Sequence, residues 1–189
     1  AIDNVNGRLY WARPFSNGEI YRCDLDGSNA QTILTLESTR VSVMAVDPIS
    51  GKLYYHEPVA NSLNRCNLDG TSPQVVTFPI NVSSMTADVG GRRLYIGLTN
   101  GTIRRLNLDT NGFIPDFLTT NRTGTMAADA AGGNLYWSNS ADRAVRRAPI
   151  VGGAIQDWAS VGMEVGERPS DGLGYLDSFN SFTRNGTAV

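Results

Sequence analysis

Short runs of apolar and β-branched residues alternate with turn residues along the whole chain. No stretch keeps the 3.6-residue apolar period of an amphipathic helix. In one representative segment the runs cover 41–46, 53–56, 62–67 and 74–78, and Gly, Asn, Asp or Pro separates them. Runs of four to eight such residues between turn residues are typical of β-strands. The pattern therefore predicts an all-β chain of short antiparallel strands.

The same pattern recurs along the chain. An Asp and, six residues later, a Leu-Tyr pair return at steps of 44, 41 and 41 residues. The aspartates are Asp3, Asp47, Asp88 and Asp129, and the pairs begin at Leu9, Leu53, Leu94 and Leu135. An arginine in the third run forms a further column, which a weaker fifth copy extends: Arg22, Arg65, Arg105, Arg147 and Arg184. Four strands every ~41 residues are typical of one propeller blade.

The repeat predicts one domain over 1–189, a small β-propeller of four-stranded antiparallel blades. The expected blades are about 1–40, 41–80, 81–122, 123–160 and 161–189. The fifth copy ends before its fourth strand, so we expect five blades with an incomplete last one. Four blades with a tail and a fragment of a larger ring are the alternatives.

The repeated motifs resemble the YWTD repeat, the class B repeat of the low-density-lipoprotein receptor. The resemblance rests on Leu-Tyr-Trp at 9–11, Leu-Asp-Gly at 25–27 and the Asp before each Leu-Tyr, and it covers about 1–158 well and 161–189 weakly. The Thr-Asp of the family's name is absent, so the pairing made by that Asp is not carried over. The resemblance implies a secreted β-propeller that binds protein. Familiar members have six blades, which need more than 189 residues at this period.

Composition narrows the choice of partner and compartment. The net charge of −2 favours neither nucleic acid nor anionic membranes, and no apolar run is long enough to span a bilayer. The chain begins at Ala1 without a leader, as a processed chain or a piece of one does. Four glycosylation sequons agree with secretion: Asn81, Asn100, Asn121 and Asn185.

Few residues are suited to metal binding or catalysis. One histidine, His56, and two cysteines exclude a His-rich or Cys-rich metal site, and the carboxylates are too sparse for a calcium cage. We expect no cofactor. His56 and Glu57 could form an acid–base pair, but no nucleophile motif accompanies them, which favours a protein that is not an enzyme.

The cysteines, Cys23 and Cys66, occupy the same position in neighbouring repeats. Equivalent points on the third strands of adjacent blades lie more than ~10 Å apart, whereas a disulfide needs Cα atoms within about 7 Å. We therefore expect two buried free thiols.

The Asp and Arg columns have structural interpretations. Each Asp opens the turn after an inner strand, where a carboxylate caps backbone N–H groups. An arginine present in every blade is expected to bond carboxylates or turn carbonyls in the neighbouring blade, and a ligand-binding ring of five arginines is the alternative.

Residues that do not repeat gather where the turns between second and third strands share one rim with the links between blades. Loops on a rigid scaffold carry binding residues, so this rim is the expected ligand face. Its candidate residues are Arg13, Phe15, Arg40, His56, Glu57, Arg122, Asn139 and Asp142. The same rim holds an expected column of amides and one carboxylate: Asn17, Asn61, Asn100, Asp142 and Asn180.

These features predict a secreted, non-enzymatic propeller that recognises an extracellular protein at the rim. A multivalent lectin is the second interpretation, because one weak sugar site per blade gains avidity on a multivalent surface. For the amide column itself, turn chemistry is the favoured interpretation and a sugar site per blade is the alternative. A propeller hydrolase or lyase is the third interpretation.

Overall fold

The computed structural model describes residues 1–13, 18–36, 40–77, 81–139, 141–160, 183–184 and 187–188, the last two pairs as backbone only. The described part is all-β, with four antiparallel four-stranded sheets in chain order. Sheet 1 consists of β1 (Ile2–Asp3), β2 (Arg8–Ala12), β3 (Glu19–Asp24) and β4 (Gln31–Thr35). Sheet 2 consists of β5 (Met44–Asp47), β6 (Lys52–Glu57), β7 (Ser62–Asn67) and β8 (Gln74–Thr77).

The second half of the chain repeats this order. Sheet 3 consists of β9 (Val82–Asp88), β10 (Arg93–Leu98), β11 (Thr102–Asn107) and β12 (Phe113–Thr119). Sheet 4 consists of β13 (Met126–Asp129), β14 (Asn134–Asn139), β15 (Ala144–Pro149) and β16 (Gln156–Ser160). Two short strands, β17 (Thr183–Arg184) and β18 (Thr187–Ala188), extend its outer edge, where Ser160 pairs with Thr183.

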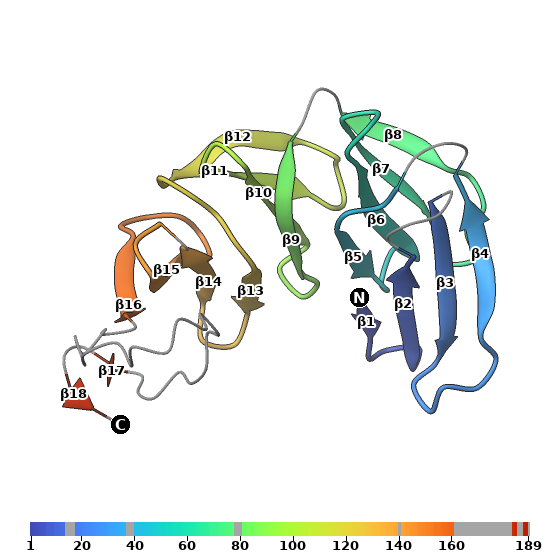
Figure 1. Cartoon of the computed structure of the whole chain (residues 1–189), viewed down its shortest axis with the longest axis horizontal. Coiled ribbons are helices and arrows are strands. Elements are labelled where there is room, and N and C mark those ends of the chain that lie inside the picture. The colour runs from blue at the N-terminus through green and yellow to red at the C-terminus, as the bar shows by residue number, and fades with distance from the viewer. Residues whose placement is uncertain are drawn as a thin grey trace, which may run out of the picture.

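The four sheets stand side by side in an arc, with the first strand of each on the concave side (Figure 1). β1, β5, β9 and β13 lie next to one another in that order. The arc does not close into a ring, because sheets 1 and 4 lie apart at its two ends (Figure 1). The arrangement is that of propeller blades. Most of the expected fifth blade lies outside the described residues, and its two described strands, β17 and β18, belong to sheet 4. The count of five blades therefore stays a prediction.

The part of the chain that the structure describes contains no helix long and apolar enough to cross a membrane.

Each sheet turns between its first two strands around the aspartate of the repeat. In sheet 1, the Asp3 carboxylate accepts bonds from the backbone N–H of Val5 and Asn6 at 3.0 and 2.9 Å. Asp88 and Asp129 accept one from Gly91 and Gly132, each at 2.8 Å. The carboxylate, which is buried in sheets 1 to 3 and exposed in sheet 4, thus satisfies donors that a tight turn leaves unpaired.

Apolar side chains fill the spaces between the sheets in three clusters, one at each junction. The junction of sheets 1 and 2 contains Tyr10, Ile20, Leu53, Tyr55 and Cys66. The next contains Tyr54, Leu63, Leu94, Ile96 and Leu106. The last contains Tyr95, Ile103, Leu135, Trp137 and Ala148. The two residues of each Leu-Tyr pair therefore pack in different junctions. The Leu contacts the preceding sheet and the Tyr the following one, because successive strand residues point to opposite faces.

Three arginines of the column cross the same junctions. Arg22 donates to the carbonyl of Leu68 at 3.0 Å, Arg65 to the amide oxygen of Asn111, and Arg105 to the carbonyl of Val151 at 3.5 Å. Every acceptor lies 46 positions further along the chain, in the turn between the third and fourth strands of the next sheet. The described bond of Arg147 goes to Gln156 in its own sheet.

Candidate functional site

The turns between second and third strands meet the links between sheets at one end of the arc, which we call the link rim. Backbone bonds join the two kinds of segment in sheets 1 and 3: Leu36 N–H to Gly18 C=O at 3.3 Å, Thr99 N–H to Asn81 C=O at 3.0 Å, and Thr120 N–H to Gly101 C=O at 3.0 Å. Antiparallel pairing brings alternate turns to the same end. The link rim is thus a physical surface made of segments distant in sequence.

A polar network ties the link rim together between sheets 3 and 4. The Asn121 amide donates to both oxygens of Asp142, at 3.1 and 2.9 Å. Asn139, only 1 % exposed, donates to Asp142 at 2.9 Å and to the oxygen of Asn121. Two of the expected rim residues, Asn139 and Asp142, therefore meet, with Asn121 as a third member.

Arg146 joins this network from β15. It forms a salt bridge of 2.6 Å with Asp142 and donates to Thr120 and Asn121 at 3.1 and 3.0 Å. Asp157 pairs with its Nε at 2.9 Å. Sequence analysis missed Arg146, although the doubled arginine at 104–105 and 146–147 marks the position.

His56 does not lie on the surface of the link rim, contrary to expectation. It is 3 % exposed inside β6, and its Nδ1 lies 2.7 Å from the hydroxyl of Ser42. Glu57 accepts a bond of 2.9 Å from the Asn64 amide. The side chains of His56 and Glu57 thus point to opposite faces of β6, as those of neighbouring strand residues do. Ser42 was missed, although Ser83 repeats it in the next sheet.

The remaining rim candidates are arginines. Arg13, Arg40 and Arg122 are exposed, and so is Arg143, which sequence analysis did not select. Arg13 lies 3.6 Å from Glu19 and sits over the ring of Tyr21, 5.6 Å from its centroid. Phe15 lies outside the described residues.

Only some residues of the expected amide column occupy equivalent positions in their sheets. From the pairing of β7, Asn61 occupies the position that Gly18, Gly101 and Arg143 occupy in the other three sheets. Asn100 and Asp142 lie one position earlier in their sheets. Asn61 has φ of 50° and Arg143 has φ of 53°, so this later position needs a left-handed backbone. Asn100 accepts a bond of 3.0 Å from the N–H of Thr102. These contacts are turn chemistry. Asn17 and Asn180 lie outside the described residues.

The sequons differ in access. Asn81 and Asn100 are exposed. The amide of Asn121 is engaged by Asp142, and the sequon's Thr123 is 4 % exposed and donates to the carbonyl of Leu98 at 2.8 Å. Attachment of a glycan to Asn121 therefore requires loss of these contacts. Asn185 lies outside the described residues.

The two cysteines are buried free thiols at equivalent positions of β3 and β7. Burial raises the pKa of the Cys66 thiol to about 11, so it stays protonated near neutral pH. Within the described ranges, no group of three or more His, Cys, Asp or Glu side chains is placed to hold a metal ion.

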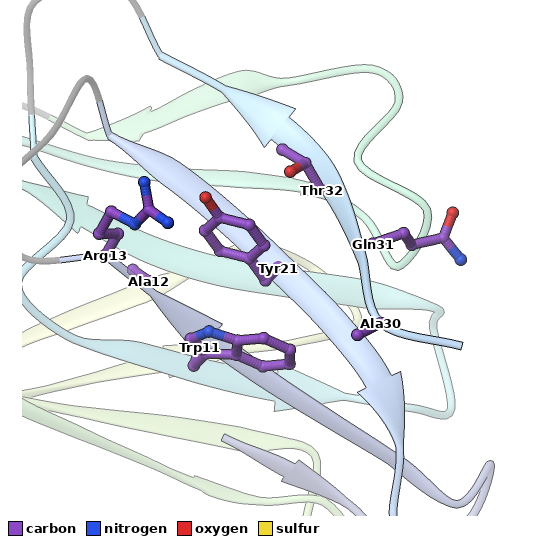
Figure 2. A pocket seen from close by; sticks show the side chains of 7 residues that line it. All are labelled: Trp11, Ala12, Arg13, Tyr21, Ala30, Gln31 and Thr32. Atoms are coloured by element: carbon purple, nitrogen blue, oxygen red, sulfur yellow. The ribbon is translucent and has the colours of Figure 1, made fainter. Parts of the chain in front are cut away.

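Two shallow hollows lie on the sheet surfaces, and the first reaches the link rim at Arg13. One, of about 530 Å³, covers the outer face of sheet 1 and is lined by Trp11, Ala12, Arg13, Tyr21, Ala30, Gln31 and Thr32 (Figure 2). Trp11 and Tyr21 stack there with centroids 5.4 Å apart and planes 13° from parallel. The other, of about 350 Å³, lies along β1, β5 and β9 and is mainly apolar in lining.

Comparison with known proteins supports the fold. No model of a protein family matches the sequence. The chain is similar to a solved nidogen/laminin complex structure, with a TM-score of 0.73 and 18 % identity, covering 82 % of this chain and 61 % of that one. It is also similar to a protein of unknown function from Bacteroides thetaiotaomicron (TM-score 0.64, 13 % identity, 82 % and 46 % covered) and to TolB from Acinetobacter baumannii (0.61, 16 %, 82 % and 42 %).

This chain thus spans about three fifths or less of the structures it resembles. Identities this low carry the fold alone, and with the four radial sheets they support a β-propeller.

Proposed function

We propose that this protein is a secreted, non-enzymatic propeller module of the YWTD type that binds an extracellular protein at its link rim. The observation that carries the proposal is the charge of that rim. Exposed arginines stand on sheet 1, on two links and on sheet 4: Arg13, Arg40, Arg122 and Arg143. The partner we expect is a protein with an acidic surface, because complementary potentials steer association and set specificity.

The turns at the opposite end of the arc expose carboxylates. Each sheet has one or more of them: Asp26, Asp69, Asp109 and Asp129. An acidic partner is attracted to the exposed arginines of the link rim.

The network around Asp142 gives the link rim the rigidity that binding requires. Asn121, Asn139, Asp142 and Arg146 hold one another across the junction of sheets 3 and 4. Arg122 and Arg143 each follow a member of this network directly, so their backbones start from fixed points. A preorganised surface loses less conformational entropy on binding.

A comparison also supports protein binding. The structure with the TM-score of 0.73 is a nidogen/laminin complex, in which the partners are proteins. Purified laminin is therefore the first candidate ligand, beside a panel of acidic extracellular proteins.

Surface plasmon resonance with immobilised chain tests the proposal. A variant with Arg40→Ala, Arg122→Ala and Arg143→Ala is expected to bind the ligand at least ~10-fold more weakly, mainly through slower association at low salt. Lys52→Ala, which removes a positive charge at the opposite end, is the control and keeps the original affinity.

Unchanged affinity in the triple variant refutes the link rim as the ligand face. A glycan array decides between the proposal and a lectin, since binding to arrayed sugars without binding to any protein of the panel favours the lectin.

A further inference from the structure

Each junction between sheets uses the same two complementary faces. One sheet contributes a tyrosine from its second strand and an aliphatic residue from its third, as Tyr95 and Ile103 do. The next sheet contributes a leucine, a bulky residue two positions later and a residue of the third strand, as Leu135, Trp137 and Ala148 do. The same roles recur at all three junctions, so the requirements of each face can be read from its equivalents.

Sheet 1 has the second kind of face, and no other sheet among the described residues covers it. Trp11 is 36 % exposed, whereas the equivalent Tyr55, Ile96 and Trp137 are 1 %, 0 % and 1 % exposed. Leu25 is 53 % exposed, whereas Leu108 is 4 % exposed. We call Leu9, Trp11, Tyr21 and Leu25 the Trp11 face. Apolar side chains of this size are rarely left together in water without a partner.

Backbone packing at the turns shows the same difference. A Cβ added to Gly70 lies 1.7 Å from the carbonyl oxygen of Ile33 in the preceding sheet, and one added to Gly152 lies 3.2 Å from the ring of Phe117. A Cβ added to the equivalent Gly27 meets nothing within 4 Å. The turn of sheet 1 thus has the shape that receives a neighbouring sheet.

The hydrogen-bonding pattern specifies what that neighbour carries. At three junctions an arginine of one sheet donates to the third turn of the next, 46 positions ahead. In sheet 1 the position matching the acceptor carbonyl of Leu68 is Leu25. An arginine from outside this part of the chain can donate there.

We propose that the Trp11 face is the docking surface for a further four-stranded sheet of this same repeat. Its tyrosine and third-strand aliphatic residue cover Trp11 and Leu9, and its arginine donates to the carbonyl of Leu25. A sheet fits better than a small ligand, because the hollow is shallow and Tyr21 already stacks on Trp11 (Figure 2). This inference is independent of the proposed function, since the Trp11 face is a sheet surface and not the link rim.

The test adds such a sheet to the whole chain. A second copy of residues 82–126 is joined before Ala1, so that Ala1 follows the copy as Ala127 follows the original. Acrylamide quenching of the Trp11 fluorescence, assigned by difference from Trp11→Phe, is expected to fall to that of a buried tryptophan. The matched control is the same extension with Tyr95→Asp and Arg105→Ala in the copy, in which Trp11 stays accessible.

A thermodynamic measurement accompanies the fluorescence. Trp11→Lys is expected to lower the unfolding midpoint much more in the extended chain than in the 189-residue chain, because docking buries the introduced charge. Equal effects in the two chains, or a Trp11 that remains equally quenchable after extension, overturn the proposal. An extension that fails to fold gives the same two results and also counts against it.

Discussion

Arg92 combines an unfavourable backbone with a strong ion pair. Its φ is 55°, in the left-handed region, where the equivalent residues of the other three sheets are Gly7, Gly51 and Gly133. Its guanidinium donates to both carboxylate oxygens of Asp47 in sheet 2, at 2.7 and 2.9 Å. Asp47 is 0 % exposed. The two-pronged bond across the junction offsets the backbone strain.

Arg92→Gly removes the strain, worth about 1 kcal/mol, and the ion pair, worth about 3–5 kcal/mol once its carboxylate is left buried and unpaired. We expect a net loss of roughly 2–4 kcal/mol in the free energy of unfolding, measured by urea denaturation. Arg92→Ala keeps the strain and should lose about 1 kcal/mol more. A glycine variant as stable as the original protein shows that the ion pair contributes little.

Acid should weaken the same contact. Burial by itself raises the pKa of Asp47, but the bonds from Arg92 and Ser50 outweigh it and hold that pKa below the ordinary value. The unfolded chain therefore binds this proton more readily, so the stabilisation is present above the ordinary aspartate pKa and is lost as the pH falls through the folded one. The free energy of unfolding should fall less steeply below about pH 4 in Asp47→Asn than in the original protein. Parallel pH profiles contradict this account.

Among single residues, sequence could predict those whose role depends on chain position. The aspartates at the first turns and the arginines of the third strands repeat because every sheet has the same turn and the same junction to satisfy. His56 and Asn61 do not repeat. His56 ends the apolar run at 53–56 and is buried in β6, and Asn61 lies one position closer to the third-strand arginine than Asn100 and Asp142 do. Such local changes of register leave no periodic signal.

At the scale of the elements, the third turn of each sheet is a contact point for the sheet before it. Gly70 and Gly27 occupy this turn in sheets 2 and 1, and both have φ of 85°. Only Gly70 faces a neighbouring backbone, the Ile33 carbonyl. Alanine substitutions at Gly27 and Gly70 therefore separate the free-energy cost of the backbone conformation from the cost of packing between sheets.

Gly27→Ala should lower the free energy of unfolding by about 1–2 kcal/mol, the cost of a left-handed alanine. Gly70→Ala should cost at least about 2 kcal/mol more, because its methyl group overlaps the neighbouring strand. Thermal and urea unfolding of both variants give the difference. If both alanines cost the same, sheets 1 and 2 do not approach closely at this point.

Strands and turns were accessible to sequence analysis because apolar runs and turn residues alternate along the whole chain. The predicted runs at 53–56 and 62–67 correspond to β6 and β7, although β6 continues to Glu57. The run at 41–46 forms a strand only from Met44. Before it, the backbones of Ser42 and Val43 both bond to the backbone of His56, so this part of the chain bulges out of the regular pairing. An apolar pattern marks buried positions, and buried residues outside a regular strand have the same pattern as those within one.

At the scale of the whole molecule, stability is the sum of contacts between neighbouring sheets. Sheets 2 and 3 have a partner on both faces, whereas sheet 1 has one described partner. In repeat architectures each unit depends on its immediate neighbours. The arc should therefore open from its end at sheet 1 before its middle opens.

Amide hydrogen exchange followed by mass spectrometry checks this order. Amides of β6 and β10 should exchange more slowly than those of β2, because opening sheet 1 breaks one junction and exposing a central sheet breaks two. Equal protection in β2 and β10 means that the arc unfolds as one cooperative unit.

The repeating sheets could be predicted from sequence, but whether they close into a ring could not. The period fixes how many similar units follow one another, and low-identity structural similarity agrees with their radial packing. Closure depends on the angle between successive sheets, which side-chain volumes at the junctions set and no period reveals. The weak fifth copy predicts another blade. Its described strands extend sheet 4, with β17 paired to β16 and β18 to β17, and most of the copy lies outside the described residues.

The outer strands share an irregularity with a consequence for solubility. The pairing of third and fourth strands shifts at the same place in every sheet: after Ile20, Leu63, Ile103 and Val145. A strand with such a bulge twists away from the flat, evenly spaced edge that a foreign strand needs for pairing. The outer strand edges of sheets 1 to 3 are thereby protected against growth into fibrils. Straightening one edge by deleting the extra residue should remove that protection locally while leaving the inner strands paired.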